Sequence, residues 1–218
     1  MVQTITALKI QTRNPGRVNV YLDARYAFAL SLNAAQGLCR GQPLSADEIA
    51  RLKAADQPAA AFDRALRFLA RRQRSIRETE RYLRRSGYPA TVVGPVIQRL
   101  RDYRYLDDAE FARQWVADRE RFRPRSGRAL RCELRQKGVD SSEIEQALAG
   151  LDETALARAA LRGSLSRWQA LARQDFKAKV CGFLGRRGFS YEIAETVFEA
   201  AWAARAGRAP WEPPTAEE

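Results

Sequence analysis

The 218-residue sequence contains no histidine, which removes the commonest general base and metal ligand. It also lacks the patterns GxxxxGK[ST], GxGxxG and GxSxG that mark phosphate loops, dinucleotide sites and nucleophile elbows. Asp107 and Asp108 are adjacent carboxylates, but Glu110 follows three residues after Asp107, a spacing typical of a helix N-cap. The sequence therefore predicts a protein without enzymatic activity, cofactor or bound metal.

Cysteine is scarce, and long apolar runs are missing. Cys39, Cys132 and Cys181 are odd in number, far apart and without CxxC spacing, so we expect reduced thiols buried among apolar neighbours. No run of about 18 apolar residues is present, and the first residues do not place a cationic segment before an apolar one. We therefore expect no membrane span, no signal peptide and a cytoplasmic location.

Positive charge is abundant. Lysine and arginine number 38 against 26 acidic residues, which gives a net charge of +12. This excess favours a polyanionic partner, above all nucleic acid or a complex that contains it, although an acidic protein surface or an anionic membrane would also attract it. A hydrophobic content of 45% is enough for a folded core.

The N-terminal residues predict strands. Apolar and polar residues alternate in residues 18–22 and 26–30, and turn signals lie at residues 14–16 and 23–25. A small three-stranded antiparallel β-meander fits this pattern. Residues 31–55 have a helical pattern, and Ser45 and Glu48 form a capping box. The pattern breaks at residues 56–58, which predicts a linker or boundary.

From about residue 60 the chain repeats itself. Three glycines, 51 and then 50 residues apart, each follow a leucine by four residues: Leu83 and Gly87, Leu134 and Gly138, Leu184 and Gly188. Apolar residues recur six and ten positions after each glycine: Val93 and Ile97, Ile144 and Leu148, Ala194 and Phe198. A period near 50 predicts stacked units of three helices, the second of which ends at the glycine.

The predicted fold class is mainly α, with elongated, curved tandem three-helix repeats after the small antiparallel β-meander. The first helices of repeats 1 and 2 are expected at residues 62–73 and 111–121. Pro95 predicts a kink or a late start in the third helix of repeat 1. The predicted divisions are 1–57 for the meander and short helices, 58–106, 107–152 and 153–206 for the repeats, and 207–218 for a disordered tail.

Arginines form single-sign stripes on the predicted helices. At about 100° per residue, four arginines of residues 62–74 share one sector opposite the apolar side chains, and four more cluster opposite Ile76 and Leu83. A second basic stretch covers residues 119–138. Because a solvated face ordinarily mixes both signs, the stripes favour a polyanion-binding surface. The predicted binding residues are Arg64, Arg67, Arg71, Arg72, Arg74, Arg77, Arg81, Arg84, Arg85, Arg125, Arg128, Arg131, Arg135 and Lys137.

Aromatic residues fall mostly at helical spacing beside Leu, Val and Ala, which favours the core over a base-stacking role. The residues so interpreted are Trp115, Phe122, Trp168, Phe176 and Phe183.

Several segments resemble the RecX family. They are Leu66-x-x-Leu69 followed by Arg72-x-Arg74-Ser75, then Leu83-Arg84-Arg85-Ser86-Gly87, then Leu106-Asp107-Asp108-x-x-Phe111-Ala112, and Glu133-Leu134-x-x-Lys137-Gly138-Val139. The third segment is fairly specific. The resemblance covers about residues 60–200 and is weakest in residues 153–206, while the N-terminal strands are similar to an extension of some members.

The resemblance implies a monomer that binds the RecA recombinase filament and inhibits its ATPase, strand exchange and co-protease activities. It also implies weaker, electrostatic contact with single- and double-stranded DNA. An alternative is a DNA-binding protein whose three-helix repeats act like helix-turn-helix units and bind DNA directly. The arginine stripes contain few Asn or Gln for adenine readout, which disfavours that alternative.

Overall fold

The computed structural model describes residues 1–205 and residue 207, and the chain divides into two compact units between Leu106 and Asp107. The described chain is mainly helical and carries an antiparallel sheet at its N-terminus, as predicted. Apart from Gly207, the predicted disordered tail lies outside the described residues. Within that part of the chain, no helix has the length and apolar character needed to cross a bilayer.

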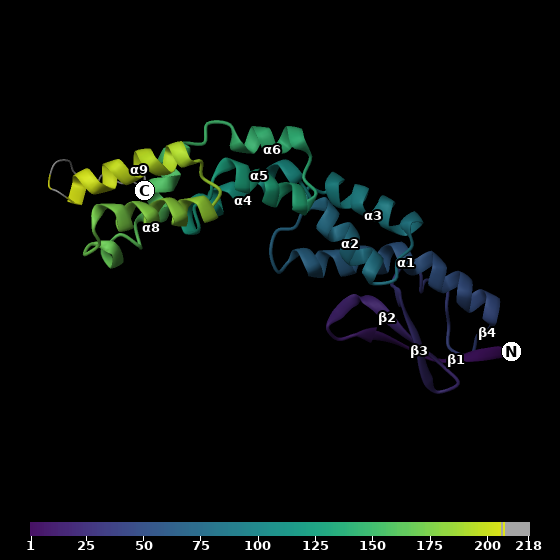
Figure 1. Ribbon diagram of the computed structural model, residues 1–218. Coiled ribbons are helices and arrows are strands. Elements are labelled where there is room, and N and C mark those ends of the chain that lie inside the picture. The colour runs from purple at the N-terminus through teal and green to yellow at the C-terminus, as the bar shows by residue number, and fades with distance from the viewer. Residues whose placement is uncertain (206, 208–218) are drawn as a thin grey trace. The chain divides into compact units, whose positions relative to one another are not determined.

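The sheet contains the predicted meander and one strand more. Strands β1 (Val2–Gln11), β2 (Asn14–Leu22), β3 (Arg25–Ser31) and β4 (Pro43–Ser45) are ordered β3-β2-β1-β4, all antiparallel. Strand β4 lies within residues 31–55, for which we predicted helix, and that prediction is wrong before Ala46. The three residues of β4 include a proline and show no alternation. One face of the sheet packs beside helix α1 (Figure 1) through a core formed by Ile5, Val20, Leu22, Phe28, Leu30 and Leu44.

Helix α1 (Ala46–Leu69) begins at the predicted Ser45–Glu48 capping box but does not stop at residues 56–58. The linker predicted there is wrong. Asp56 is buried, and its carboxylate accepts hydrogen bonds from Ser31 N and Arg17 Nη2, both at 2.7 Å. The polar residues that break the helical pattern therefore attach the middle of α1 to the sheet.

The first repeat consists of the C-terminal half of α1 with α2 (Ile76–Arg85) and α3 (Ala90–Asp102). Its core comprises Ala61, Ala65, Leu83, Val93, Val96, Ile97, Leu100 and Leu106. The predicted first helix, residues 62–73, ends earlier than expected, at Leu69. Pro95 lies inside α3, which starts at Ala90 and therefore not late.

The second unit contains the other two repeats. Helices α4 (Asp108–Phe122), α5 (Gly127–Lys137) and α6 (Ser141–Leu148) form one. Helices α7 (Glu153–Leu161), α8 (Arg173–Arg186) and α9 (Tyr191–Arg205) form the other, with a 3-10 turn η1 (Ser166–Trp168) after α7. Each repeat has its own apolar core, and the Asp107 carboxylate caps α4 by accepting from Glu110 N at 3.0 Å.

The three repeat glycines are structurally equivalent. Gly87, Gly138 and Gly188 have φ angles of 90°, 85° and 92°, where a side chain would be strained. The residue after each glycine donates its backbone N–H to the carbonyl of the repeat leucine five positions earlier, at 3.2–3.3 Å. This is the 6→1 bond of a Schellman motif. Since all three leucines are fully buried, the predicted repeat is confirmed.

Two groups of side chains are not where we predicted them. All three cysteines are free thiols, but they are not buried as we predicted: Cys39 and Cys132 are exposed and Cys181 is half-buried. Phe122, at the end of α4, is 68% exposed and therefore is not a core residue. The other four aromatics assigned to the core do pack against apolar clusters.

Candidate functional site

The first arginine surface comprises the nine predicted arginines between residues 64 and 85. Because α1 ends at Leu69, only Arg64 and Arg67 lie on that helix. Arg71, Arg72 and Arg74 lie in the connection to α2, so the four-residue helical stripe that we predicted is wrong. The connection must become extended at Ser75, whose side chain caps α2. The remaining four arginines, Arg77, Arg81, Arg84 and Arg85, lie on α2 and are exposed.

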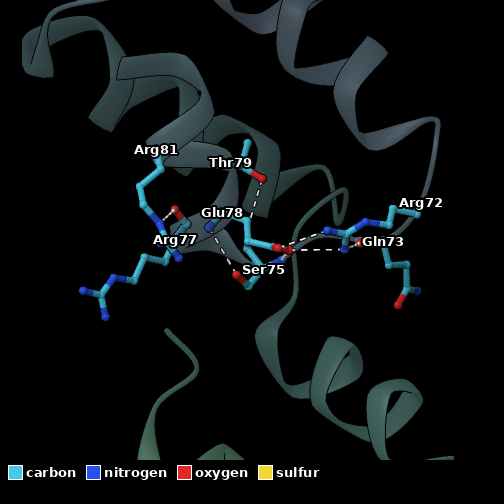
Figure 2. A network of polar contacts seen from close by, with 7 residues as sticks. All are labelled: Arg72, Gln73, Ser75, Arg77, Glu78, Thr79 and Arg81. Atoms are coloured by element: carbon cyan, nitrogen blue, oxygen red, sulfur yellow. Dashed lines mark hydrogen bonds and ion pairs between the residues drawn. The ribbon is translucent and has the colours of Figure 1, made fainter. Parts of the chain in front are cut away.

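Arg72 is held by the capping box of α2 (Figure 2). Its Nη2 donates to Glu78 Oε1 at 3.1 Å and its Nη1 to Glu78 Oε2 at 3.4 Å. Glu78 also accepts from Ser75 N, and its own N–H donates to Ser75 Oγ at 3.2 Å. Nη1 of Arg72 donates in addition to the Gln73 carbonyl at 2.9 Å. These bonds give Arg72 a structural role in the turn.

Two further arginines rest on aromatic rings. Phe68 and Tyr82 are stacked with their centroids 4.0 Å apart and their planes at 5°. The guanidinium of Arg74 lies 4.2 Å from the Phe68 centroid, and that of Arg64 lies 5.7 Å from the Tyr82 centroid. Burial lowers the pKa of Arg74, and the charge of Arg72 lowers it further. The stack therefore fixes Arg74 and Arg64 without neutralising either charge.

Five arginines of this surface are exposed and have no ion pair within residues 1–205: Arg67, Arg71, Arg77, Arg84 and Arg85. Arg77 extends away from the capping network in Figure 2, and its carbonyl accepts from Arg81 Nε at 3.3 Å. The side chains that remain available to an anionic partner are therefore concentrated around the α1–α2 connection and α2.

The second arginine surface comprises Arg125, Arg128, Arg131, Arg135 and Lys137, on and just before α5. Glu133 neutralises part of it, because its carboxylate contacts Arg119 Nε at 2.9 Å and Arg125 Nη1 at 3.0 Å. Trp115 Nε1 donates to the same carboxylate at 2.8 Å. We did not predict this role of Glu133, whose only signal was an acidic residue in a basic stretch.

Arg131 is paired as well. Its Nε and Nη2 donate to the two carboxylate oxygens of Glu145, both at 2.7 Å, which raises the pKa of Arg131 and lowers that of Glu145. Lys137 is half-buried, and its Nζ lies 5.0 Å from the Trp115 ring. Arg128 and Arg135 are exposed and have no ion pair among the described side chains. The second surface thus offers less free charge than the first.

No three acidic or cysteine side chains of the described chain gather as metal ligands would. The fold and its surfaces define a helical-repeat protein rich in exposed arginine. Four family models match in chain order: the RecX N-terminal domain at residues 3–45, and the first, second and third RecX three-helix domains at 61–100, 107–148 and 152–198. The chain belongs to the RecX family of regulatory proteins, which are not enzymes.

Individual relatives agree with the family assignment. The regulatory protein RecX of Bacillus subtilis (strain 168) is 32% identical over 200 residues, covering 89% of this chain and 76% of the relative. That of Bacillus pumilus is 29% identical, covering 91% and 77%. A crystal structure of a regulatory protein RecX matches with a TM-score of 0.65 and 27% identity, over 90% of this chain and 99% of the other.

Proposed function

We propose that this protein binds the RecA–DNA filament and inhibits RecA ATPase, strand exchange and co-protease activities. Membership of the RecX family supports RecA as the partner. The observation that carries the proposal is the first arginine surface, where five exposed arginines have no ion pair within the described chain. An arginine without an internal partner can hold phosphate or carboxylate through two parallel hydrogen bonds.

The filament presents such anionic groups repeatedly along its axis. Several weak contacts made by one body act together, so affinity for the filament should exceed affinity for isolated RecA. Contacts across neighbouring RecA subunits would restrict their relative motion and obstruct a second DNA strand, which explains inhibition without chemistry. We expect a cytoplasmic monomer that binds single- and double-stranded DNA more weakly and loses affinity steeply with salt.

A RecA ATPase assay on single-stranded DNA tests the proposal. Wild-type protein should lower ATP hydrolysis, and the double variant Arg71→Glu/Arg77→Glu should need at least about tenfold more protein for half-inhibition. Both side chains are exposed, so the variant should stay folded. The control Arg13→Glu/Arg40→Glu makes the same change in net charge at two exposed arginines of the N-terminal region and should inhibit normally.

Two results would contradict the proposal. Wild-type protein that leaves ATP hydrolysis unchanged would remove the proposed function. A folded Arg71→Glu/Arg77→Glu variant that inhibits at the wild-type concentration would remove the first arginine surface from it. A footprint at one specific sequence of bare DNA would instead support the helix-turn-helix alternative.

A further inference from the structure

Helix α3 ends in the same turn as the helices before the three repeat glycines, but an arginine occupies the place of glycine. Arg104 N–H donates to the Arg101 carbonyl and Tyr105 N–H to the Leu100 carbonyl, both at 2.8 Å. Gly87 and Tyr88 make the two equivalent bonds at the end of α2. Arg104 has a φ angle of 57°, in the left-handed region that disfavours side chains.

The two backbone bonds accompany this strain, but the Arg104 side chain forms no hydrogen bond within the described residues that would compensate for it. The Arg104 side chain is exposed and forms no ion pair within residues 1–205. Glycine in its place would satisfy the same two backbone bonds without strain, as it does at Gly87. A residue that keeps a strained backbone, although glycine would fit its place better, indicates a role for its side chain in binding.

The residues on either side of Arg104 are exposed tyrosines. Tyr103 is 56% exposed and Tyr105 is 55% exposed, and their ring centroids are 6.4 Å apart with the planes at 80°. Tyr103 is supported from the protein side by an edge contact with Phe62 at 6.0 Å. The Arg99 guanidinium lies 4.4 Å from Phe62 and 5.4 Å from Tyr103, so this ring is held in place.

The charge around the tyrosines is positive. Residues 99–105 contain three arginines and one acidic residue, Asp102, which already accepts from Gln98 Nε2 at 2.9 Å. Arg101 is exposed and, like Arg104, has no ion pair in the part of the chain that the structure describes. Exposed aromatic rings alone could contact many kinds of partner. Rings that alternate with unpaired arginines favour a ligand whose flat aromatic groups are joined by anionic groups.

We propose that this tyrosine–arginine patch, formed by Arg99, Arg101, Tyr103, Arg104 and Tyr105, binds single-stranded DNA. Unpaired bases would stack on the two rings and the phosphates would contact Arg101 and Arg104. A duplex hides the faces of its bases, so the patch should prefer single strands. The inference rests on the proposed contact with filament DNA but uses none of the residues that the sequence predicted.

Fluorescence anisotropy with a labelled oligo(dT) 20-mer and a duplex of the same length tests the patch. Arg104→Gly should leave the melting temperature unchanged or higher, since it relieves strain, yet weaken oligo(dT) binding several-fold. Tyr105→Ser should weaken oligo(dT) binding by about tenfold and duplex binding by less than about twofold. Arg40→Gly removes one exposed charge elsewhere and should bind like wild type. An oligonucleotide containing 5-iodouracil should photo-crosslink to Tyr103 or Tyr105.

Three outcomes would overturn the inference. Wild-type affinity of both patch variants for oligo(dT) would exclude the site. An equal loss of single-strand and duplex binding in Tyr105→Ser would exclude base stacking. Unchanged oligo(dT) binding together with lost RecA inhibition would identify a protein partner instead. Failure of the proposed function would be measured in a different assay, since wild-type protein would then not inhibit the RecA ATPase.

Discussion

Arg72 contacts both carboxylate oxygens of Glu78, the residue that completes the capping box of helix α2. One ion pair therefore connects the start of α2 to the turn that carries Arg71 and Arg74. Among the free arginines of the first surface, Arg71 lies in this turn and Arg77 lies in the first turn of α2. Substitutions can separate the contribution of this turn to stability from its contribution to binding.

Ser75→Ala should lower the free energy of unfolding by about 1 kcal/mol. The Ser75 side chain is buried, and its hydroxyl accepts the N–H of Glu78 in the first turn of α2 at 3.2 Å. Urea denaturation followed by circular dichroism measures the change. Arg67→Ala, at an exposed position of α1, serves as the control and should change stability little. Equal stability of the two variants would contradict the structural role of the cap.

Arg74→Glu should destabilise the first unit, whereas Arg71→Glu should not. Arg74 lies against Phe68 and has a buried Nε with no hydrogen-bond partner among the described residues, while Arg71 is exposed. A carboxylate over the ring loses the cation–π contact and faces burial, at a cost of about 1–2 kcal/mol. Thermal melts of both variants check this difference. Identical melting temperatures would show that the stack contributes nothing.

Gly188→Ala should be more destabilising than Gly87→Ala. Both glycines have left-handed backbones, which costs alanine about 1 kcal/mol. At Gly188 an added Cβ would also lie 2.6 Å from Ser126 Oγ and 2.9 Å from Ala129 Cβ, whereas at Gly87 nothing lies within 4 Å. We expect about 2–4 kcal/mol for Gly188→Ala, because the start of α5 must move. Chemical denaturation of the two variants gives the comparison.

The Arg131–Glu145 pair should stabilise the second unit in a pH-dependent way. The pair lowers the folded-state pKa of Glu145 below its ordinary value of 4.5. Its contribution is therefore complete above pH 4.5 and is lost as the pH falls through the lowered pKa. Denaturation midpoints of wild type and Glu145→Gln should differ at neutral pH and converge in acid, once the pH lies below the lowered pKa of Glu145. A difference that persists unchanged in acid would exclude the carboxylate as its source.

Local patterns were enough to predict much of the fold. The Ser45 and Asp107 caps, the strand alternation and the Leu–Gly spacing depend on residues a few positions apart, and all appear in the structure as predicted. The family's third domain matches residues 152–198, where the sequence motifs were weakest. The continuation of α1 through residues 56–58 and strand β4 were not predictable in this way, because Asp56 and Leu44 depend on partners distant in the chain.

The same limit applies to the candidate site. Basic residues were easily found, but whether each is free depends on tertiary partners. Arg131 and Glu145 are 14 residues apart, and Arg119, Arg125 and Glu133 meet across the α4–α5 connection. The sequence also shows Arg104 between two tyrosines. The positive φ angle that distinguishes Arg104 from the other arginines is visible only in the structure.

The buried Asp56 carboxylate has a consequence for folding cooperativity. It ties the middle turns of α1 to β2 and β3, while the last turns of the same helix complete the core of the first repeat. A helix shared by two cores cannot unravel in one without weakening the other. Amide protons in the centre of α1 should consequently exchange only when the sheet and the first repeat open together, as one foldon.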